Sequence, residues 1–149
     1  MVYRSKVDAW IALLVGGGAL VSVAVGAMLL WQGERLGWLV LLLMPGLLRL
    51  LAWPIDYEVA DSELVIRAGV LRWRIPIASI VNVEPTRNPL SSPAWSLDRL
   101  RVRYRPDRSG RPRIRWIQIS PEEKQAFLLE LAARDPALQL NGEHLSRTR

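Results

Sequence analysis

Residues 10–31 contain no charged side chain, and this run limits the folds open to the chain more than any other feature. As a helix it would cover roughly 33 Å, enough to cross a hydrocarbon core of about 30 Å. A cleaved signal peptide is the competing interpretation, but its apolar region is normally only about 7–15 residues long and ends in a small-residue cleavage site. Here Gly26 and Ala27 continue directly into further apolar residues. The run therefore predicts a first transmembrane helix over residues 10–31.

A second apolar run follows a short polar turn at residues 32–36 and extends over residues 37–53. Pro45 interrupts this run and predicts a kink, because proline removes a backbone hydrogen bond. Arg49 lies near enough to the end for its guanidinium group to reach the membrane interface. A buried core helix would also explain this run taken alone. Its position directly after the first run favours a transmembrane hairpin of two helices.

Tryptophans fall at or near the four ends of the two predicted spans, where amphipathic rings are enriched at membrane interfaces. These residues are Trp10, Trp31, Trp38 and Trp53. Small residues recur every fourth position along one face of the first span, at Gly18, Ser22 and Gly26, and such spacing lets helices approach closely. Packing against the second span is the favoured interpretation, and a homo-oligomer is the alternative.

Basic residues predict the orientation of the hairpin. Arg4 and Lys6 precede it, Arg67, Arg72 and Arg74 follow it, and the turn between the spans has only Arg35. Because basic flanks are retained in the cytoplasm, the segment 1–9 and the C-terminal part should both be cytoplasmic. The turn at 32–36 should then be extracytoplasmic.

The apolar period changes from helical to alternating after the second span, which predicts a β-rich domain over residues 56–136. Strands are predicted at residues 57–60, 63–68, 71–75, 80–83, 97–105 and 113–119. The phase break at Ile117 predicts a bulge or a strand covered on both faces. Ser120 as cap, Pro121 at the first helical position and Glu123 in a capping box predict a helix that ends at residues 135–136. Residues 137–149 are predicted to be a flexible tail.

The net charge of +6 is concentrated in the β-rich domain, where residues 61–120 carry twelve arginines against five acids. Alternation places Arg99, Arg101, Arg103 and Arg105 on one strand face, joined across a hairpin by Arg111, Arg113 and Arg115, with Arg72 and Arg74 on an earlier strand. Such a face predicts attraction to anionic lipid headgroups, although a merely solvated face would have the same composition. A loop contact is predicted at Asn88, Pro89, Leu90, Ser91 and Ser92.

Composition argues against several other functions. The chain has no cysteine and one histidine, His144 in the tail, so a metal site or a histidine-based catalytic group has little material. Asp98 and Glu84 are the only acid–base pair to consider, and an ion pair of Asp98 with Arg99 is the simpler interpretation. Nucleic-acid binding is disfavoured because Tyr104 and Trp116 are predicted to lie on the buried side, away from the arginines. We expect no enzyme activity, cofactor or metal.

At this point the sequence resembles the membrane-anchored form of the bacterial pleckstrin-homology-like (PH-like) domain family. The likeness lies in residues 3–8, 63–69, 75–80, 88–94, 96–100 and 119–121. The resemblance implies a PH-like β-barrel with a C-terminal helix, in the bacterial cytoplasmic membrane. It implies no catalytic residues and no inositol-lipid binding. Six predicted strands against the usual seven leave the closure of the barrel open.

Together these observations predict a non-catalytic, membrane-tethered binding or scaffolding module that contacts anionic lipid through a basic sheet face. The alternative is a subunit of a larger membrane assembly whose β domain docks an acidic protein partner.

Overall fold

The structure, a computed structural model, describes residues 1–52, 54–88, 96–106 and 114–148. The predictions for Trp53, Pro89, Leu90, Ser91, Ser92, Arg111 and Arg113 lie outside these ranges. The helical elements are α1 (Ala9–Trp31), α2 (Gly37–Leu47), a π-helical turn η1 (Leu48–Ala52), a 3₁₀ turn η2 (Ile77–Ser79) and α3 (Lys124–Arg134). The strands are β1 (Val2–Arg4), β2 (Ile55–Val59), β3 (Glu63–Ala68), β4 (Leu71–Pro76), β5 (Ile80–Thr86), β6 (Arg99–Tyr104), β7 (Arg115–Ile119), β8 (Leu138–Asn141) and β9 (His144–Arg147).

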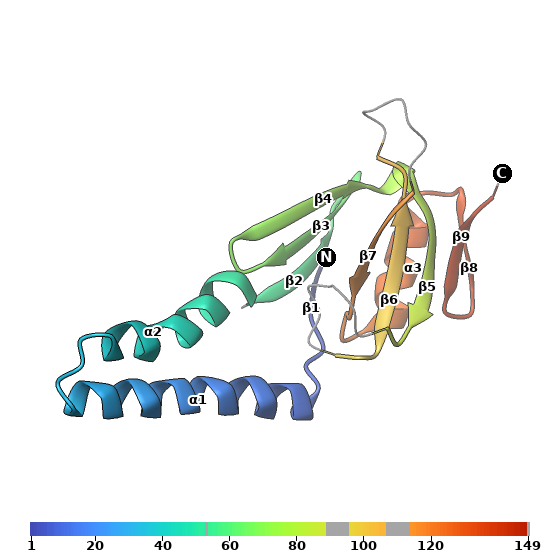
Figure 1. The fold of residues 1–149 in the computed structure, drawn as a ribbon. Helices are drawn as coiled ribbons and strands as arrows, with labels where there is room; N and C mark the ends of the chain where they lie inside the picture. The colour runs from blue at the N-terminus through green and yellow to red at the C-terminus, as the bar shows by residue number, and fades with distance from the viewer. Residues whose placement is uncertain (53, 89–95, 107–113, 149) are drawn as a thin grey trace.

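The two N-terminal helices lie side by side and project from the β-rich part of the molecule (Figure 1). Among the described residues, α1 is the one helix both long and apolar enough to cross a bilayer. The predicted second span is only partly α-helical. Helix α2 continues through Pro45 and gives way to the π-helical turn η1 at Leu48.

The first sheet has the order β1-β2-β3-β4 and is antiparallel throughout. Its edge strand β1 comes from the segment 1–9, for which the sequence predicted no strand. Tyr3 of β1 lies opposite Tyr57 of β2, and the helices are therefore an insertion between two paired strands. A strand of three residues carries too little periodicity to be recognised before its partner is known.

The second sheet has the order β7-β6-β5-β9-β8. Its last two strands correct the prediction of a flexible tail at residues 137–149, because β8 and β9 form a hairpin and β9 pairs with β5. Leu138 and Leu145 anchor this hairpin in the core and are 3% and 0% exposed. Burial of two leucines offsets the ordering of the segment.

The predicted barrel is two separate sheets and is not closed. The two sheets are linked at one point by an isolated bridge between Ser5, after β1, and Pro121, after β7. The helix α3 covers the core with Phe127, Leu128 and Leu131. The ring of Tyr3 packs edge-on against Phe127, with centroids 5.4 Å apart.

The predicted helix cap and the predicted bulge in β7 are wrong. Helix α3 begins at Lys124, without a side-chain cap, and Ser120 is buried with its hydroxyl oxygen 3.1 Å from that of Ser5. Of the two alternatives for Ile117, the bulge is wrong, because β7 keeps regular register with β6. Coverage of both faces agrees with the structure at the end of β7, where the adjacent Gln118 and Ile119 are both buried. The irregularity in this sheet lies instead in β5, between Ile80 and Asn82.

Candidate functional site

The helices present an apolar surface that the rest of the chain leaves uncovered. Gly26 is the buried residue of α1, whereas Leu13 and Leu20 are 76% and 72% exposed. Helix α2 likewise exposes Leu39 and Leu42. Exposed apolar surface of this extent marks a contact with a membrane or another protein, because monomeric soluble proteins rarely leave it in water.

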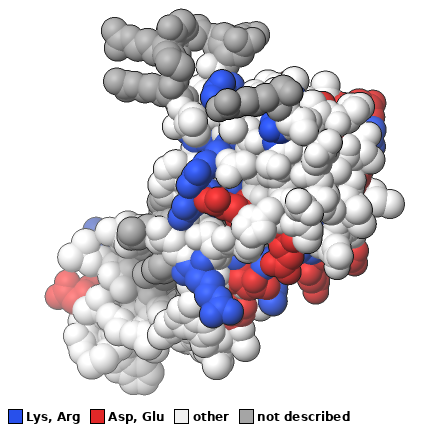
Figure 2. All heavy atoms as spheres, turned by 90° about the vertical axis from the view of Figure 1, so that its right-hand side faces the viewer, with Lys and Arg blue, Asp and Glu red and all other residues white. Residues whose placement is uncertain are grey.

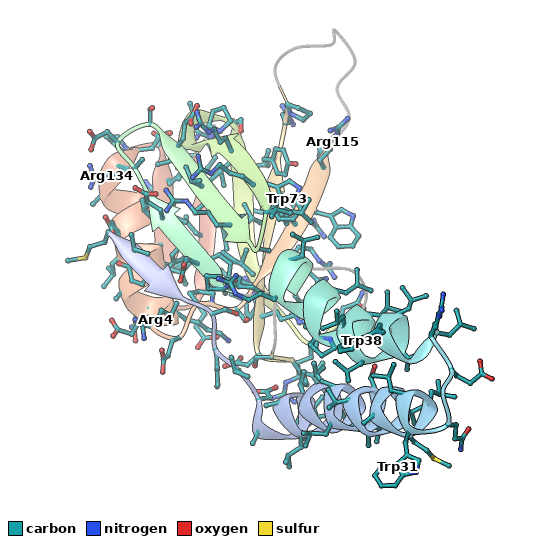
Figure 3. The ribbon with its side chains drawn as sticks, turned by 90° about the vertical axis from the view of Figure 1, so that its left-hand side faces the viewer. Arg4, Trp31, Trp38, Trp73, Arg115 and Arg134 are labelled. Atoms are coloured by element: carbon teal, nitrogen blue, oxygen red, sulfur yellow. The ribbon has the colours of Figure 1, made fainter. Side chains whose placement is uncertain are left out.

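The described tryptophans of the helices are exposed, and their contact with a membrane interface stays a prediction. Trp10 lies in the first turn of α1, close to the domain. Trp31 and Trp38 lie near the turn at the far end of the hairpin, and Figure 3 shows Trp31 pointing away from the rest of the molecule.

The two helices touch at the small residues of α1. A Cβ atom added to Gly26 would lie 2.6 Å from the Cβ and backbone nitrogen of Leu41. The hydroxyl of Ser22 donates a hydrogen bond to the carbonyl oxygen of Val40. A Cβ atom added to Gly18 would meet nothing within 4 Å. Ser22 and Gly26 therefore pack within the chain, and a homo-oligomer through this face stays a prediction.

Hydrogen bonds hold the chain between β1 and α1 to the domain. We call this segment, together with the residues that it contacts, the junction. Asp8 accepts hydrogen bonds from the Ser96 hydroxyl and the Leu97 backbone N–H, each at 2.8 Å. The Leu97 N–H, followed by the Ser96 hydroxyl, outweighs burial and lowers the pKa of Asp8. The Tyr57 hydroxyl accepts the Ser120 N–H at 3.1 Å. Helix α1 is therefore attached to the domain by specific contacts, without a loose linker.

A basic row crosses the outer face of the first sheet where the sheet meets the helices. Register pairs Arg4 with Asp56, Asp56 with Arg67, and Arg67 with Arg72, so these four residues share one face. We use "basic row" for Arg4, Arg67 and Arg72. Arg4 and Arg72 are exposed, and Arg67 forms an ion pair with Glu58. Arg74 lies two residues farther along β4 on the same face and is also exposed.

The sequence predicted only Arg72 and Arg74 of this surface as binding residues. Arg67 could have been added, because the predicted strands 63–68 and 71–75 are separated by two residues, and a hairpin with that loop places Arg67 opposite Arg72. Arg4 could not, because its position depends on the pairing of β1 with β2 across the whole helical insertion.

The arginines predicted to form one basic face on β6 and β7 are divided. Arg99 is 5% exposed, and its guanidinium group donates to the backbone carbonyl oxygens of Ser96 and Asn88 and to the side-chain oxygen of Gln118. Arg101 and Arg103 both form ion pairs with Glu84.

The other described arginines of that prediction lie elsewhere. Arg115 is the register partner of Tyr104, so it belongs to the face opposite Arg101 and Arg103. It lies at the end of β7 away from the helices (Figure 3). Arg105 follows the end of β6 and is exposed. Acidic side chains interrupt the basic ones over the side of the domain seen in Figure 2.

Trp116 was placed on the buried side, and this prediction is wrong. Trp116 is paired with Arg103, is 47% exposed, and its ring centroid lies 5.7 Å from the guanidinium carbon of Arg101. Cation–π contacts of this kind contribute about 0.5–1 kcal/mol at exposed sites. The outer face of β6 and β7 therefore combines an aromatic ring with partly neutralised arginines.

The acid–base pair considered from the sequence is not assembled. Asp98 forms ion pairs with Lys6 and Lys124, and its pKa is lowered mainly by the Lys124 hydrogen bond. Glu84 binds arginines instead. Within the described part of the chain, no cluster of three or more histidine, aspartate or glutamate side chains could hold a metal ion.

Comparison with known proteins gives one match. A family model described as "Bacterial PH domain" matches residues 55–135. The search of curated proteins found no match, and neither did the search of solved structures.

Proposed function

Because the chain belongs to the bacterial PH domain family, we propose that it is a non-catalytic binding module anchored in the bacterial cytoplasmic membrane by a transmembrane hairpin. The hairpin consists of α1, α2 and η1, and the turn between the helices is extracytoplasmic. The domain lies in the cytoplasm, where its basic row contacts anionic lipid headgroups.

The pairing of β1 with β2 is the observation that carries this proposal. β1 precedes α1 and β2 follows η1, so the chain enters and leaves the helical insertion on one side. If α1 alone crossed the membrane, Tyr3 and Tyr57 would be separated by the bilayer. Spanning by α1 therefore requires the chain to return through α2 and η1.

The short second helix is compatible with this return. Residues 37–52 would cover roughly 24 Å at helical rise, several ångströms less than the hydrocarbon core. Bilayers adapt to such a mismatch by local thinning and by side chains that reach the interface. Arg49 is exposed near the domain end of this segment, where a long cationic side chain can reach the headgroups.

A cleaved signal peptide fits the structure poorly. Cleavage after the apolar run would remove β1 and with it Tyr3, which is 8% exposed and packed on Phe127. The first sheet would then lose an edge strand and the core would lose an aromatic ring. Loss of a buried aromatic side chain costs about 3–5 kcal/mol.

Charge supports both the orientation and the lipid contact. The basic row and Lys6 flank the hairpin on the domain side, and the turn at the other end has Glu34 beside Arg35. Near an anionic leaflet each basic side chain contributes about 1 kcal/mol, which salt screens.

A protein partner has one observation in its favour. Trp116 and Ile114 are about half exposed, and the Trp116 ring contacts Arg101. Aromatic residues and arginine are enriched in protein interfaces. Membrane purification of the full chain and of Trp116→Ala distinguishes this function. A partner that copurifies with the full chain and is lost from Trp116→Ala would favour an assembly subunit.

Cysteine labelling tests the anchor, since the chain has no cysteine of its own. The variants Glu34→Cys, in the helix turn, and Val2→Cys, in β1, are expressed in the full chain. A membrane-impermeant maleimide should label Glu34→Cys in intact spheroplasts and Val2→Cys only after lysis. Equal labelling of both before lysis, or release of the protein by alkaline washing, would contradict the proposal.

A further inference from the structure

The turn between β3 and β4 is fastened to the domain end of the second helix. The backbone N–H of Val70 donates to the carbonyl oxygen of Leu50 at 2.9 Å, and that of Gly69 donates to Pro54 at 3.0 Å. Gly69 has a φ of 54°, a conformation that glycine adopts without strain. Figure 1 shows this turn beside the end of the helical hairpin.

The tip of this turn is apolar and uncovered. Val70 is 63% exposed and Leu71 is 44% exposed, whereas Ala68, which precedes the turn, is 2% exposed. Polar residues are usual at an exposed β-turn, because an apolar side chain that stays in water contributes no hydrophobic stabilisation. Folding of the domain therefore does not explain why the side chains at this tip are apolar.

The apolar tip continues the apolar surface of the second helix. A shallow groove along α2 is lined by Trp38, Leu39, Leu42, Leu43, Gly46, Leu47 and Leu50, together with Arg35 at its far end. Leu47 and Leu50 are 43% and 50% exposed, and Leu50 is the residue that binds the turn. Leu50 lies two residues before the end of η1 at Ala52, so the tip lies beside the last turn of the helix.

Charge changes abruptly behind the tip. Arg72 follows Leu71 directly, and the register places Arg67 opposite Arg72 on the outer face of the sheet. An apolar edge backed by cations matches the order of layers in a bilayer, where hydrocarbon gives way to phosphate groups. This order favours lipid over a protein as the material that covers Val70 and Leu71.

We infer that the β3–β4 turn inserts Val70 and Leu71 into the membrane interface beside the second helix. The turn is then a third membrane contact of the chain, in addition to α1 and α2. It fixes how the domain lies on the bilayer and brings the basic row to the headgroups. This inference rests on the proposed membrane anchor and deepens it by assigning a lipid-contacting element outside the helices.

Spin-label accessibility tests the inference on the full chain in vesicles of phosphatidylethanolamine and phosphatidylglycerol. Val70→Cys and Leu71→Cys are labelled singly, and collisions with lipid-soluble oxygen are compared with collisions with a water-soluble nickel chelate. Leu42→Cys on α2 is the lipid-facing control. Leu129→Cys on α3 is a matched control on the domain, because Leu129 is 56% exposed.

The inference expects oxygen accessibility to exceed nickel accessibility severalfold at Val70 and Leu71, as at Leu42, and the reverse at Leu129. A nickel-accessible Val70 and Leu71 with an oxygen-accessible Leu42 would overturn the inserted turn and leave the anchor standing. Nickel accessibility at Leu42 as well would overturn both. The backbone N–H of Val70 is kept in every variant, so its hydrogen bond to Leu50 does not depend on the substitution.

Discussion

Tyr3 and Tyr57 face each other across two neighbouring strands, although the entire helical hairpin separates them in the sequence. The hydroxyl of Tyr3 donates to Glu130 of α3 at 2.7 Å, and that of Tyr57 bonds to the junction at Ser5 and Ser120. The two tyrosines therefore connect the segment before the helices with the strand after them. This connection places both ends of the hairpin on one side of any membrane that it crosses.

Tyr3→Ala should strongly destabilise the domain. The side chain is 8% exposed and packs on Phe127, so truncation should lower the free energy of unfolding by about 3–5 kcal/mol. Tyr3→Phe keeps the ring and should cost about 1.5–3 kcal/mol for the hydrogen bond to the Glu130 carboxylate. Denaturant unfolding of the full chain in micelles measures both. Equal stability of Tyr3→Ala and the unchanged protein would show that β1 does not hold the domain.

Gly26→Ala should loosen the helical hairpin. The added Cβ would lie 2.6 Å from backbone and side-chain atoms of Leu41, so α1 and α2 would have to move apart. Gly17→Ala is the matched control, because a Cβ at Gly17 meets nothing within 4 Å. Thermal unfolding in micelles should give a lower Tm for Gly26→Ala alone. A Tm that falls equally in both variants would indicate a general effect of glycine replacement.

Arg72→Gln should weaken the retention of anionic lipid. With about 1 kcal/mol per cation at an anionic surface, the loss amounts to about fivefold, and it should shrink at high salt. Arg115→Gln removes the same charge from an exposed position outside the basic row and is the control. Native mass spectrometry of the protein with bound phosphatidylglycerol gives the comparison. If Arg115→Gln had the larger effect, the lipid contact would belong to the β6–β7 hairpin.

The junction should weaken in acid. The Leu97 N–H and the Ser96 hydroxyl lower the pKa of Asp8, so ionised Asp8 stabilises the folded protein above its unfolded pKa of about 3.9. This contribution is lost as the pH falls through the lower folded pKa. The Tm difference between the protein and Asp8→Asn should therefore be largest near neutrality and shrink toward about pH 3. Asp98 and Asp135 also have lowered pKa values, but both are present in the two proteins and cancel. A Tm difference that did not change with pH would assign the stabilisation to something other than the charge of Asp8.

Local patterns in the sequence were sufficient for several of the helices and strands. Alternation over residues 63–68 and 71–75 predicted β3 and β4, and the uncharged run predicted α1. These signals are carried by neighbouring residues, because the side-chain period of a strand or helix depends only on local geometry. The family resemblance also depends on short stretches of neighbouring residues, and the match over residues 55–135 confirms it.

Pairings between distant segments were beyond such patterns. The short strands β1 and β9 pair with strands far away in the chain, and β8 is added to the sheet by its hairpin with β9. Burial of their apolar side chains offsets the entropy lost when these strands become ordered. The side of the sheet on which Trp116 lies depended on the register of β7 with β6, and a shift by one residue exchanges the two faces.

The long apolar helix, the β-rich domain and the excess of arginine can all be predicted from composition and short-range period. The roles of the individual arginines depend on the tertiary structure. Some lie near the helices in the basic row, others form ion pairs with Glu84, and Arg99 is buried. Only the tertiary structure decided that the helices are an insertion between β1 and β2. Strand pairing depends on which arrangement buries the whole core, and the residues of that core come from many segments of the chain.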